Sequence, residues 1–164
     1  MNRRTFITGL SAGIGCLALH ISCKKEAGAK KLTFGIISDV HQDLQADAVR
    51  RLQTFIDEAN KRKPDFIIQL GDLSHGEGLH TIKAVWEQFS GKKYSVMGNH
   101  DTDHATKEQV VQGLNMPSKY YSYDLEGVHF VVLDLNYFLK EGQYIDNDHG
   151  NYFQATMGVD RDLI

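Results

Sequence analysis

The chain has 164 residues, of which 41% are hydrophobic and 24% are charged. This length and apolar content suffice for one globular domain and are too small for two. The formal net charge is -3, and the sequence has no run of lysines and arginines interleaved with aromatic residues. We therefore do not expect nucleic acid as a partner, because a phosphate backbone requires a positively charged surface.

Residues 1–29 have the character of an export leader rather than of a folded segment. Arg3 and Arg4 give a basic start, Phe6 follows, and an apolar, glycine-rich stretch runs over 9–21. This order is typical of signal sequences. The paired arginines followed by Phe6 resemble a twin-arginine signal, which exports proteins already folded. An ordinary secretory leader is the first alternative, and a membrane anchor is a weaker one because the apolar stretch is short and broken by glycines.

Two cleavage sites are consistent with this leader. Ser22 precedes Cys23, as in lipoprotein signals that attach a lipid to the cysteine thiol, whereas Ala27-Gly28-Ala29 offers an A-x-A site. The expected location is periplasmic, either free or anchored to the membrane through a lipid on Cys23. Because both cysteines, Cys16 and Cys23, lie in the leader, no intramolecular disulfide is expected in the mature domain, residues 30–164.

Three short apolar runs after the leader predict strands, over 32–37, 66–70 and 94–97. The segments that follow them have apolar residues at helical spacing. Asp47 is expected to cap the first of these helices, and Pro64 to end it. The apolar faces of the three predicted helices consist of Ala48, Leu52, Phe55, Ile56 and Ala59, then Ile82, Val85, Trp86 and Phe89, then Val110, Val111 and Leu114.

This β-α-β-α-β order predicts an α/β fold with a parallel sheet flanked by helices. After Pro117, runs over 120–125 and 128–133 flank Glu126-Gly127, which predicts an antiparallel hairpin. The tail over 136–164 is polar and aromatic, and we expect it to be loop-like. A terminal loop of that length is unusual in a compact domain, which favours a fragment of a longer protein.

Three motifs follow the three predicted strands: Asp39-Val40-His41, Gly71-Asp72 and Gly98-Asn99-His100-Asp101. The carboxyl ends of parallel strands meet at one edge of a sheet, so these side chains are expected to converge. Carboxylate, imidazole and amide groups are ligands of divalent cations, and a two-metal site needs a bridging carboxylate. Each aspartate taken singly is better explained by turn formation or helix capping. The three motifs together favour a metal site.

The spacing within the motifs suggests a role for each side chain. Asp39 and His41 are two residues apart, so in an extended backbone they point the same way and can hold one cation. Asp72 brings a carboxylate from the neighbouring strand end, and the amide oxygen of Asn99 is available to a second cation. His100 then remains for proton chemistry.

In these motifs the sequence resembles the N-terminal half of the calcineurin-like metallophosphoesterases, whose motifs run D-x-H, G-D, G-N-H-[DE], a lone histidine and G-H-x-H. The resemblance covers about residues 32–134. Matched by position, the ligands of the first metal are Asp39 and His41, the bridging carboxylate is Asp72, and a ligand of the second metal is Asn99. His100 matches the histidine that contacts the scissile phosphate or protonates the leaving oxygen, and Asp101 is expected to orient its ring.

The resemblance implies part of a two-sheet sandwich fold and an exported phosphoesterase with two divalent ions, Mn, Fe or Zn. Its substrate would be a small phosphomonoester or phosphodiester. The lone histidine and G-H-x-H do not occur before Ile164. We therefore expect weak metal binding and little activity from this chain alone. A catalytically incomplete binding or scaffold domain of the same fold is the alternative hypothesis.

Other polar residues are expected to have simpler roles. The histidines outside the three motifs are interpreted as surface residues, namely His75, His80, His104 and His129. The polar and aromatic segment 144–152 either closes over a substrate or forms a solvated tail.

Overall fold

The computed structural model describes residues 31–75 and 78–152, so the predicted leader at 1–29 lies outside the described residues. Within those ranges no helix has the length and apolar character needed to span a membrane. The elements in chain order are β1 (Phe34–Ile37), α1 (Ala48–Arg62), β2 (Phe66–Gln69), α2 (Leu79–Trp86), β3 (Lys92–Ser95), a 3-10 turn η1 (His100–Thr102), α3 (Lys107–Gly113), β4 (Tyr121–Leu125), β5 (Val128–Val132), β6 (Tyr137–Lys140) and β7 (Gln143–Asp146).

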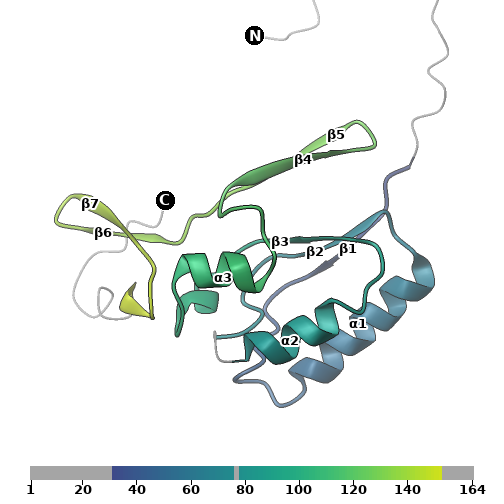
Figure 1. Ribbon diagram of the computed structural model, residues 1–164, viewed down its shortest axis with the longest axis horizontal. Helices are drawn as coiled ribbons and strands as arrows, with labels where there is room; N and C mark the ends of the chain where they lie inside the picture. The colour runs from purple at the N-terminus through teal and green to yellow at the C-terminus, as the bar shows by residue number, and fades with distance from the viewer. Residues whose placement is uncertain (1–30, 76–77, 153–164) are drawn as a thin grey trace, which may run out of the picture. The chain divides into compact units, whose positions relative to one another are not determined.

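The first three strands form a parallel sheet in the order β1-β2-β3, which confirms the predicted β-α-β-α-β unit (Figure 1). Phe34 of β1 pairs with Phe66 of β2, and Phe66 pairs with Lys92 of β3. The third strand begins two residues earlier than predicted. Val96 and Met97 therefore lie beyond its end and lead into the loop that holds Asn99.

Helices α1 and α2 cover one face of this sheet and form the main core with it. The predicted apolar faces are confirmed, because Leu52, Ile56, Ile82 and Trp86 are all buried against the sheet residue Ile67. Phe89 lies just past the end of α2 and is buried in the same core.

The start of α1 differs in detail from the prediction. Asp47 precedes the helix, but its side chain makes no capping hydrogen bond. Its carboxylate instead accepts hydrogen bonds from Arg51 Nε at 3.0 Å and from Arg50 at 3.1 Å. The competing guanidinium groups explain why the cap is absent. The end of the helix is as predicted, with Lys63 in a left-handed conformation before Pro64.

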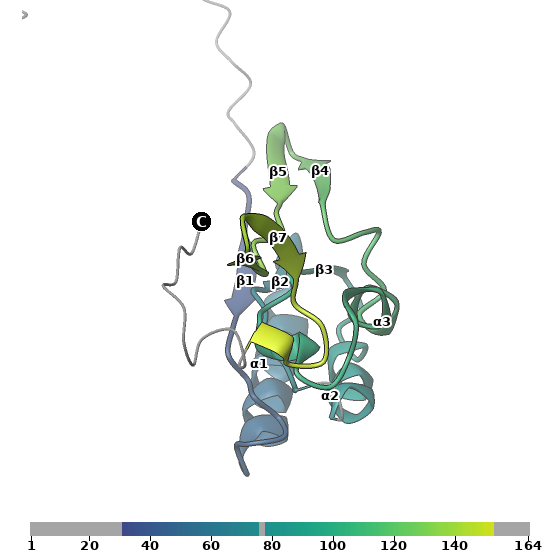
Figure 2. The same ribbon diagram turned by 90° about the vertical axis from the view of Figure 1, so that its left-hand side faces the viewer.

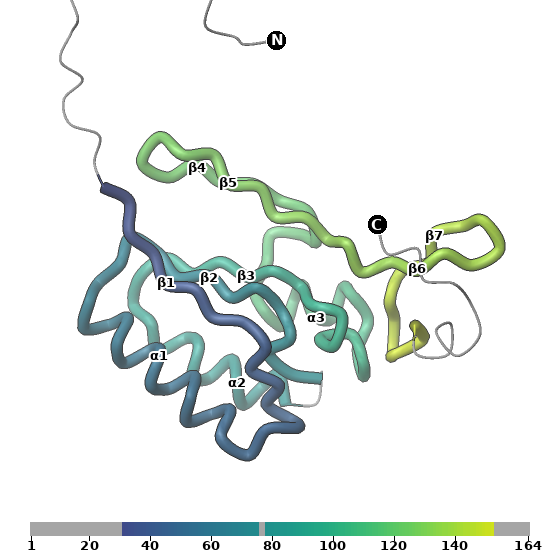
Figure 3. The backbone as a smooth tube through the Cα atoms, turned by 180° about the vertical axis from the view of Figure 1, so that it is seen from behind, coloured from purple at the N-terminus to yellow at the C-terminus, as the bar shows by residue number. Residues whose placement is uncertain are grey.

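The β4–β5 hairpin covers the other face of the parallel sheet, as seen from behind in Figure 3. Phe66 of β2 contacts Tyr123 and Phe130 of the hairpin, with ring centroids 5.9 and 5.3 Å apart in edge-to-face geometry. Edge-to-face aromatic pairs contribute stability beyond their buried area. The predicted turn is confirmed, since Glu126 and Gly127 both have positive φ, 51° and 81°, as a type I′ hairpin turn requires.

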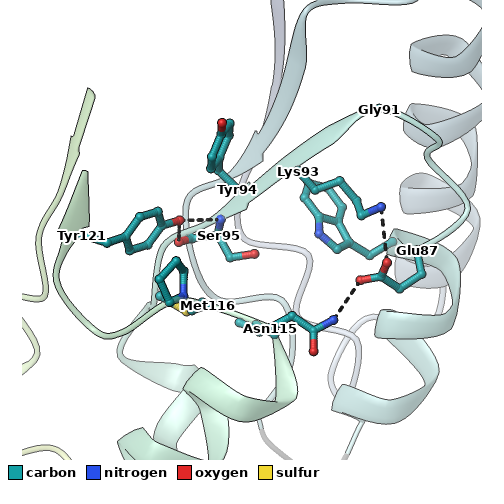
Figure 4. Close-up of a pocket in the computed structure, with 11 residues that line it drawn as sticks. Glu87, Gly91, Lys93, Tyr94, Ser95, Asn115, Met116 and Tyr121 are labelled. Carbon is teal, nitrogen blue, oxygen red and sulfur yellow. Dashed lines mark hydrogen bonds and ion pairs between the residues drawn. The ribbon is translucent and has the colours of Figure 1, made fainter. Parts of the chain in front are cut away.

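Tyr121 attaches this hairpin to the edge strand β3 (Figure 4). Its hydroxyl accepts a hydrogen bond from Ser95 N–H at 3.0 Å and donates one to the Ser95 carbonyl at 2.7 Å. The phenol thus satisfies the backbone groups of the buried Ser95 at the edge of the sheet. Burial raises the pKa of Tyr121, so its hydroxyl stays protonated and able to donate. The bond lies beside a cavity of about 270 Å³, where Lys93 and Glu87 form an ion pair at 3.2 Å.

The prediction of a loop-like tail after residue 136 is wrong for the described part of it. Strands β6 and β7 form a second antiparallel hairpin. Its turn residues Glu141 and Gly142 have φ values of 52° and 79°, close to those of Glu126 and Gly127. The same Glu-Gly pair therefore specifies both turns, and the sequence signal was present in the segment interpreted as loop.

A buried lysine connects the β6–β7 hairpin to the rest of the domain. Lys107 Nζ lies 2.6 Å from Asp134 and 2.8 Å from Asp146, and 3.6 Å from the centroid of the Tyr137 ring. Lys107 and Asp134 have side chains only 2% and 0% exposed. In Figure 2 the edge where the parallel strands end faces the viewer, and the β6–β7 hairpin lies there. The ion pairs therefore hold the hairpin beside the loops that carry the motifs.

We predict that Lys107→Met lowers the free energy of unfolding by about 3–5 kcal/mol, because it leaves the buried Asp134 charge uncompensated. Urea denaturation followed by circular dichroism measures the change. Lys119→Met is the matched control, since Lys119 also pairs with Asp146, at 3.3 Å, but is 31% exposed. The control is expected to cost less than about 1 kcal/mol. Equal losses in the two variants would contradict the assignment of Lys107 as the buried anchor.

Candidate functional site

The loops that follow the three parallel strands run beside one another at one edge of the sheet. Asp39 N–H donates to the Gly71 carbonyl at 3.2 Å, and His41 N–H donates to the Asp72 carbonyl at 2.9 Å. These bonds continue the β1–β2 pairing beyond the regular strands. As a result the first two motifs lie next to each other.

The second and third motifs meet through two glycines. A Cβ atom at Gly71, where φ is +102°, would lie 2.5 Å from Gly98 N. A Cβ atom at Gly98 would lie 2.1 Å from Asp72 Oδ1 and 2.4 Å from Asp72 N. No real Cβ tolerates such distances, so only glycine allows these two turns to approach this closely.

Asp101 holds this contact together from inside the protein. Its carboxylate accepts hydrogen bonds from the N–H groups of Asp72, Leu73, Ser74 and Gly98, at 2.8–3.3 Å. Burial raises the pKa of Asp101 to about 7, against the opposing effect of these N–H donors. The sequence-based prediction that Asp101 orients the His100 ring is therefore wrong. Its oxygens are used to fix the backbone of two loops.

Three of the predicted metal ligands have left-handed backbone conformations. The φ values of Asp39, His41 and Asp72 are 55°, 49° and 56°. Asp39 and His41 thus do not share the extended backbone that the sequence suggested. Strained residues of this kind cluster at functional sites, where the surrounding structure maintains them.

These three residues nevertheless converge. One ligand atom from each of Asp39, His41 and Asp72 lies within 4.8 Å of the others. His41 Nε2 and Asp39 Oδ1 are 3.6 Å apart. Two carboxylate oxygens and an imidazole nitrogen form a donor set that suits Mn, Fe or Zn. The residues present therefore fit a divalent cation.

Asn99 lies on the loop after β3, adjacent to this group. Its Nδ2 atom donates to the Tyr152 hydroxyl at 3.3 Å. This bond orients the amide and leaves its oxygen as the atom that can bind a cation. The backbone N–H of the next residue, His100, donates to Asp72 Oδ1 at 2.9 Å, which joins the third motif to the second.

The carboxylate at the His100 ring is Asp103. His100 Nδ1 and Asp103 Oδ2 are 2.9 Å apart, and the Asp103 side chain is only 6% exposed. The turn η1 places His100 and Asp103 three residues apart on one face. Sequence spacing alone favoured the adjacent Asp101, whereas the turn brings Asp103, two positions further on, to the His100 ring.

His75 is a site residue that sequence reasoning assigned to the surface. It is 8% exposed. Its Nδ1 atom lies 2.6 Å from Asp103 Oδ2, and its Nε2 atom lies 3.1 Å from His41 Nδ1. His75, His100 and Asp103 also form a second group whose ligand atoms lie within 4.8 Å of one another. The sequence feature that could have identified His75 as a site residue was its position, three residues after Asp72 in the same loop.

The other three histidines are placed differently. His104 and His129 are exposed, as predicted, and His129 pairs with Asp124 on the hairpin at 2.8 Å. His80, at the start of α2, is exposed as well, as predicted.

Tyr152 brings the segment 144–152 into the site. The side chain is buried, and its hydroxyl donates to Asp103 and lies 3.2 Å from His100 Nδ1. Burial, together with the hydrogen bond to Asp103, raises the pKa of Tyr152. The sequence analysis interpreted this segment either as closing over a substrate or as a solvated tail. The second interpretation is wrong for Tyr152, because this residue packs against the predicted site residues.

Comparison with known proteins gives one family match. The family model described as calcineurin-like phosphoesterase matches residues 32–163. No sequence among the curated proteins matches the chain. Among solved structures, the crystal structure of a dimetal phosphatase from Danio rerio is similar, with 21% identity and a TM-score of 0.47. The match covers 52% of this chain and 35% of that chain, so this chain spans about a third of that phosphatase's length.

We predict that Asp101→Asn destabilises the fold, because the amide nitrogen would face backbone N–H groups that now donate to a carboxylate oxygen. Two unsatisfied buried donors correspond to a loss of about 2–5 kcal/mol in the free energy of unfolding. Urea denaturation of the metal-free protein measures it. Asp124→Asn, on the exposed hairpin, is the control and should change stability by less than about 0.5 kcal/mol. An Asp101→Asn protein as stable as the control would refute the role assigned to this carboxylate.

Proposed function

Because the chain belongs to the calcineurin-like phosphoesterase family, we propose that it is a metal-dependent phosphoesterase that hydrolyses phosphomonoesters or phosphodiesters of small molecules. The observation that carries this proposal is the convergence of Asp39, His41 and Asp72 at the carboxyl end of the parallel sheet. In α/β folds this edge is where ligands bind.

The metal ligands follow from the donor atoms. Asp39 and His41 would hold one divalent ion, Asp72 would be shared between two ions, and Asn99 would contribute its amide oxygen to the second. Bound divalent ions supply Lewis acidity and lower the pKa of coordinated water. Mn, Fe and Zn all suit this mixture of oxygen and nitrogen donors.

His100 is the residue suited to proton transfer. Its Nδ1 atom faces Asp103, so Nε2 is the ring nitrogen that would serve a phosphate oxygen or a leaving alkoxide. The buried Asp103 carboxylate accepts from Nδ1 and so holds the ring in one orientation. His100 is thus the proposed catalytic residue, and Asp101 is not.

A non-catalytic domain of the same fold is the competing function. The observation that favours it is the size of the ligand set, because the three motifs supply four ligands, Asp39, His41, Asp72 and Asn99, to two ions. An under-filled site binds metal weakly. Metal uptake and hydrolysis therefore have to be measured together.

We predict that the chelator-treated protein is inactive and that added Mn²⁺ restores hydrolysis of p-nitrophenyl phosphate or of its bis ester. Asp72→Asn should abolish the restored activity, because both ions would lose their shared ligand. His100→Gln should retain Mn²⁺ uptake and lower kcat about 10²–10⁴-fold, as expected for loss of a general acid. Release of nitrophenolate measures the rate, and calorimetry measures uptake.

Asp57→Asn, on the exposed side of α1, is the control and should keep the activity of the unaltered protein. Full activity of Asp72→Asn would refute the phosphoesterase proposal. Absence of both Mn²⁺ uptake and hydrolysis would favour the non-catalytic alternative.

We further propose that the protein is exported to the periplasm, with or without a lipid on Cys23. The support for this proposal is the leader sequence, in which Arg3, Arg4 and Phe6 precede the apolar stretch. A twin-arginine route would allow the domain to fold and bind its metal ions before export.

We predict that replacing Arg3 and Arg4 together by lysine retains the protein in the cytoplasm, because lysine keeps the charge but removes the paired arginines. Cell fractionation and immunoblotting of the periplasm measure the change. Cys23→Ala tests lipid attachment separately: a move from the membrane fraction to the soluble periplasm would indicate a lipid on Cys23, and an unchanged soluble location would indicate cleavage without one. Normal export of the double lysine variant would argue for an ordinary secretory leader.

A further inference from the structure

We propose that His75 is a positioning residue that orients the metal ligand His41, by relaying a hydrogen bond from the buried Asp103 carboxylate. The chain of contacts is continuous. Asp103 Oδ2 lies 2.6 Å from His75 Nδ1, and His75 Nε2 lies 3.1 Å from His41 Nδ1. His75 thus connects the loop after β2 both to the loop after β1 and to the turn after β3.

The protons in this chain have one consistent arrangement when both imidazoles are neutral. An ionised Asp103 is an acceptor only, so His75 must carry its proton on Nδ1 and donate it. His75 Nε2 is then an acceptor, and His41 must carry its proton on Nδ1. This assignment leaves the lone pair of His41 on Nε2, the atom 3.6 Å from Asp39 Oδ1.

The orientation of His41 matters because a metal ion binds only the unprotonated nitrogen of a neutral imidazole. Hydrogen bonds to the other ring nitrogen fix the tautomer and the ring plane of metal-ligating histidines. Here that bond comes from a second histidine rather than directly from a carboxylate. The left-handed φ of His41, 49°, gives an additional reason why its side chain needs external support.

Asp103 is well placed to anchor the relay. Its side chain is 6% exposed, and it also accepts hydrogen bonds from His100 Nδ1, at 2.9 Å, and from the Tyr152 hydroxyl. One buried carboxylate therefore sets the tautomers of two rings, His41 through His75 and His100 directly. Asp103 thus supports both the proposed metal ligand, His41, and the proposed general acid, His100.

This inference rests on the proposed function, because it assigns His41 to a metal ion. Two amide variants separate the two contacts of His75. An asparagine places its polar atoms near the position of Nδ1, so His75→Asn can still donate to Asp103 but cannot reach His41. A glutamine is one methylene longer, so His75→Gln can accept from His41 Nδ1. His129→Asn, on the exposed hairpin, is the matched control.

The first measurement is the tautomer of His41 in the metal-free, full-length chain, read from ¹⁵N chemical shifts of labelled histidine. We expect the proton on Nδ1 in the unaltered protein, in His75→Gln and in His129→Asn, and on Nε2 in His75→Asn. The second measurement is Mn²⁺ affinity by calorimetry. It should be about 10–100-fold weaker in His75→Asn and near the original value in His75→Gln.

The same His41 tautomer in all four proteins would overturn the proposal. Selective broadening of His75 signals by Mn²⁺ ahead of those of His41 would also overturn it, by placing the ion in the group of His75, His100 and Asp103. If the His75→Asn variant does not fold, the tautomer of the unaltered protein decides the question. A proton on His41 Nε2 in that protein would overturn the proposal. If the unaltered protein takes up no Mn²⁺ but the tautomers follow the expected pattern, the proposed function fails and the positioning role stands.

Discussion

The site depends on the close contact between two glycine turns at the carboxyl end of the parallel sheet. Gly71 and Gly98 approach each other at distances that exclude any Cβ atom, and the buried Asp101 carboxylate binds the N–H groups of both turns. Parallel pairing alone would bring the strand ends to within one strand spacing. The glycines close the remaining gap, so that the side chain of Asp72 lies between the loop after β1 and the loop after β3.

A second layer of polar contacts then determines which atoms face the centre. Asp103 accepts from His75, His100 and Tyr152, and none of these three donors was assigned to it by the sequence pattern. Charge-assisted hydrogen bonds in a buried environment are strong and strongly directional. These hydrogen bonds fix which atoms of the ionisable groups donate and which accept. Both proton transfer and metal binding require such defined donors and acceptors.

The sequence predicted the parallel sheet, its two covering helices and the first hairpin because each depends on local periodicity and on a turn signal. It also predicted the convergence of Asp39, His41 and Asp72, since strand order places their loops at one edge. It missed His75 and Asp103 because their roles depend on ring orientation and on a single 3-10 turn, which no spacing rule encodes. The β6–β7 hairpin was missed because polar composition outweighed the Glu141-Gly142 turn signal.

The placement of Tyr152 shows how far the site extends along the chain. Backbone bonds from His149 to Ala105 and from Gly150 to Thr102, at 3.1 and 2.9 Å, tie this segment to the turn that carries His100. Burial alone would raise the pKa of Asp146, but the Lys107 hydrogen bond and charge outweigh it, so the net pKa is lowered and the carboxylate stays ionised to hold the hairpin. Two backbone hydrogen bonds and the ion pair between Lys107 and Asp146 therefore hold the segment against the site. A lid that opens for substrate would have to break them.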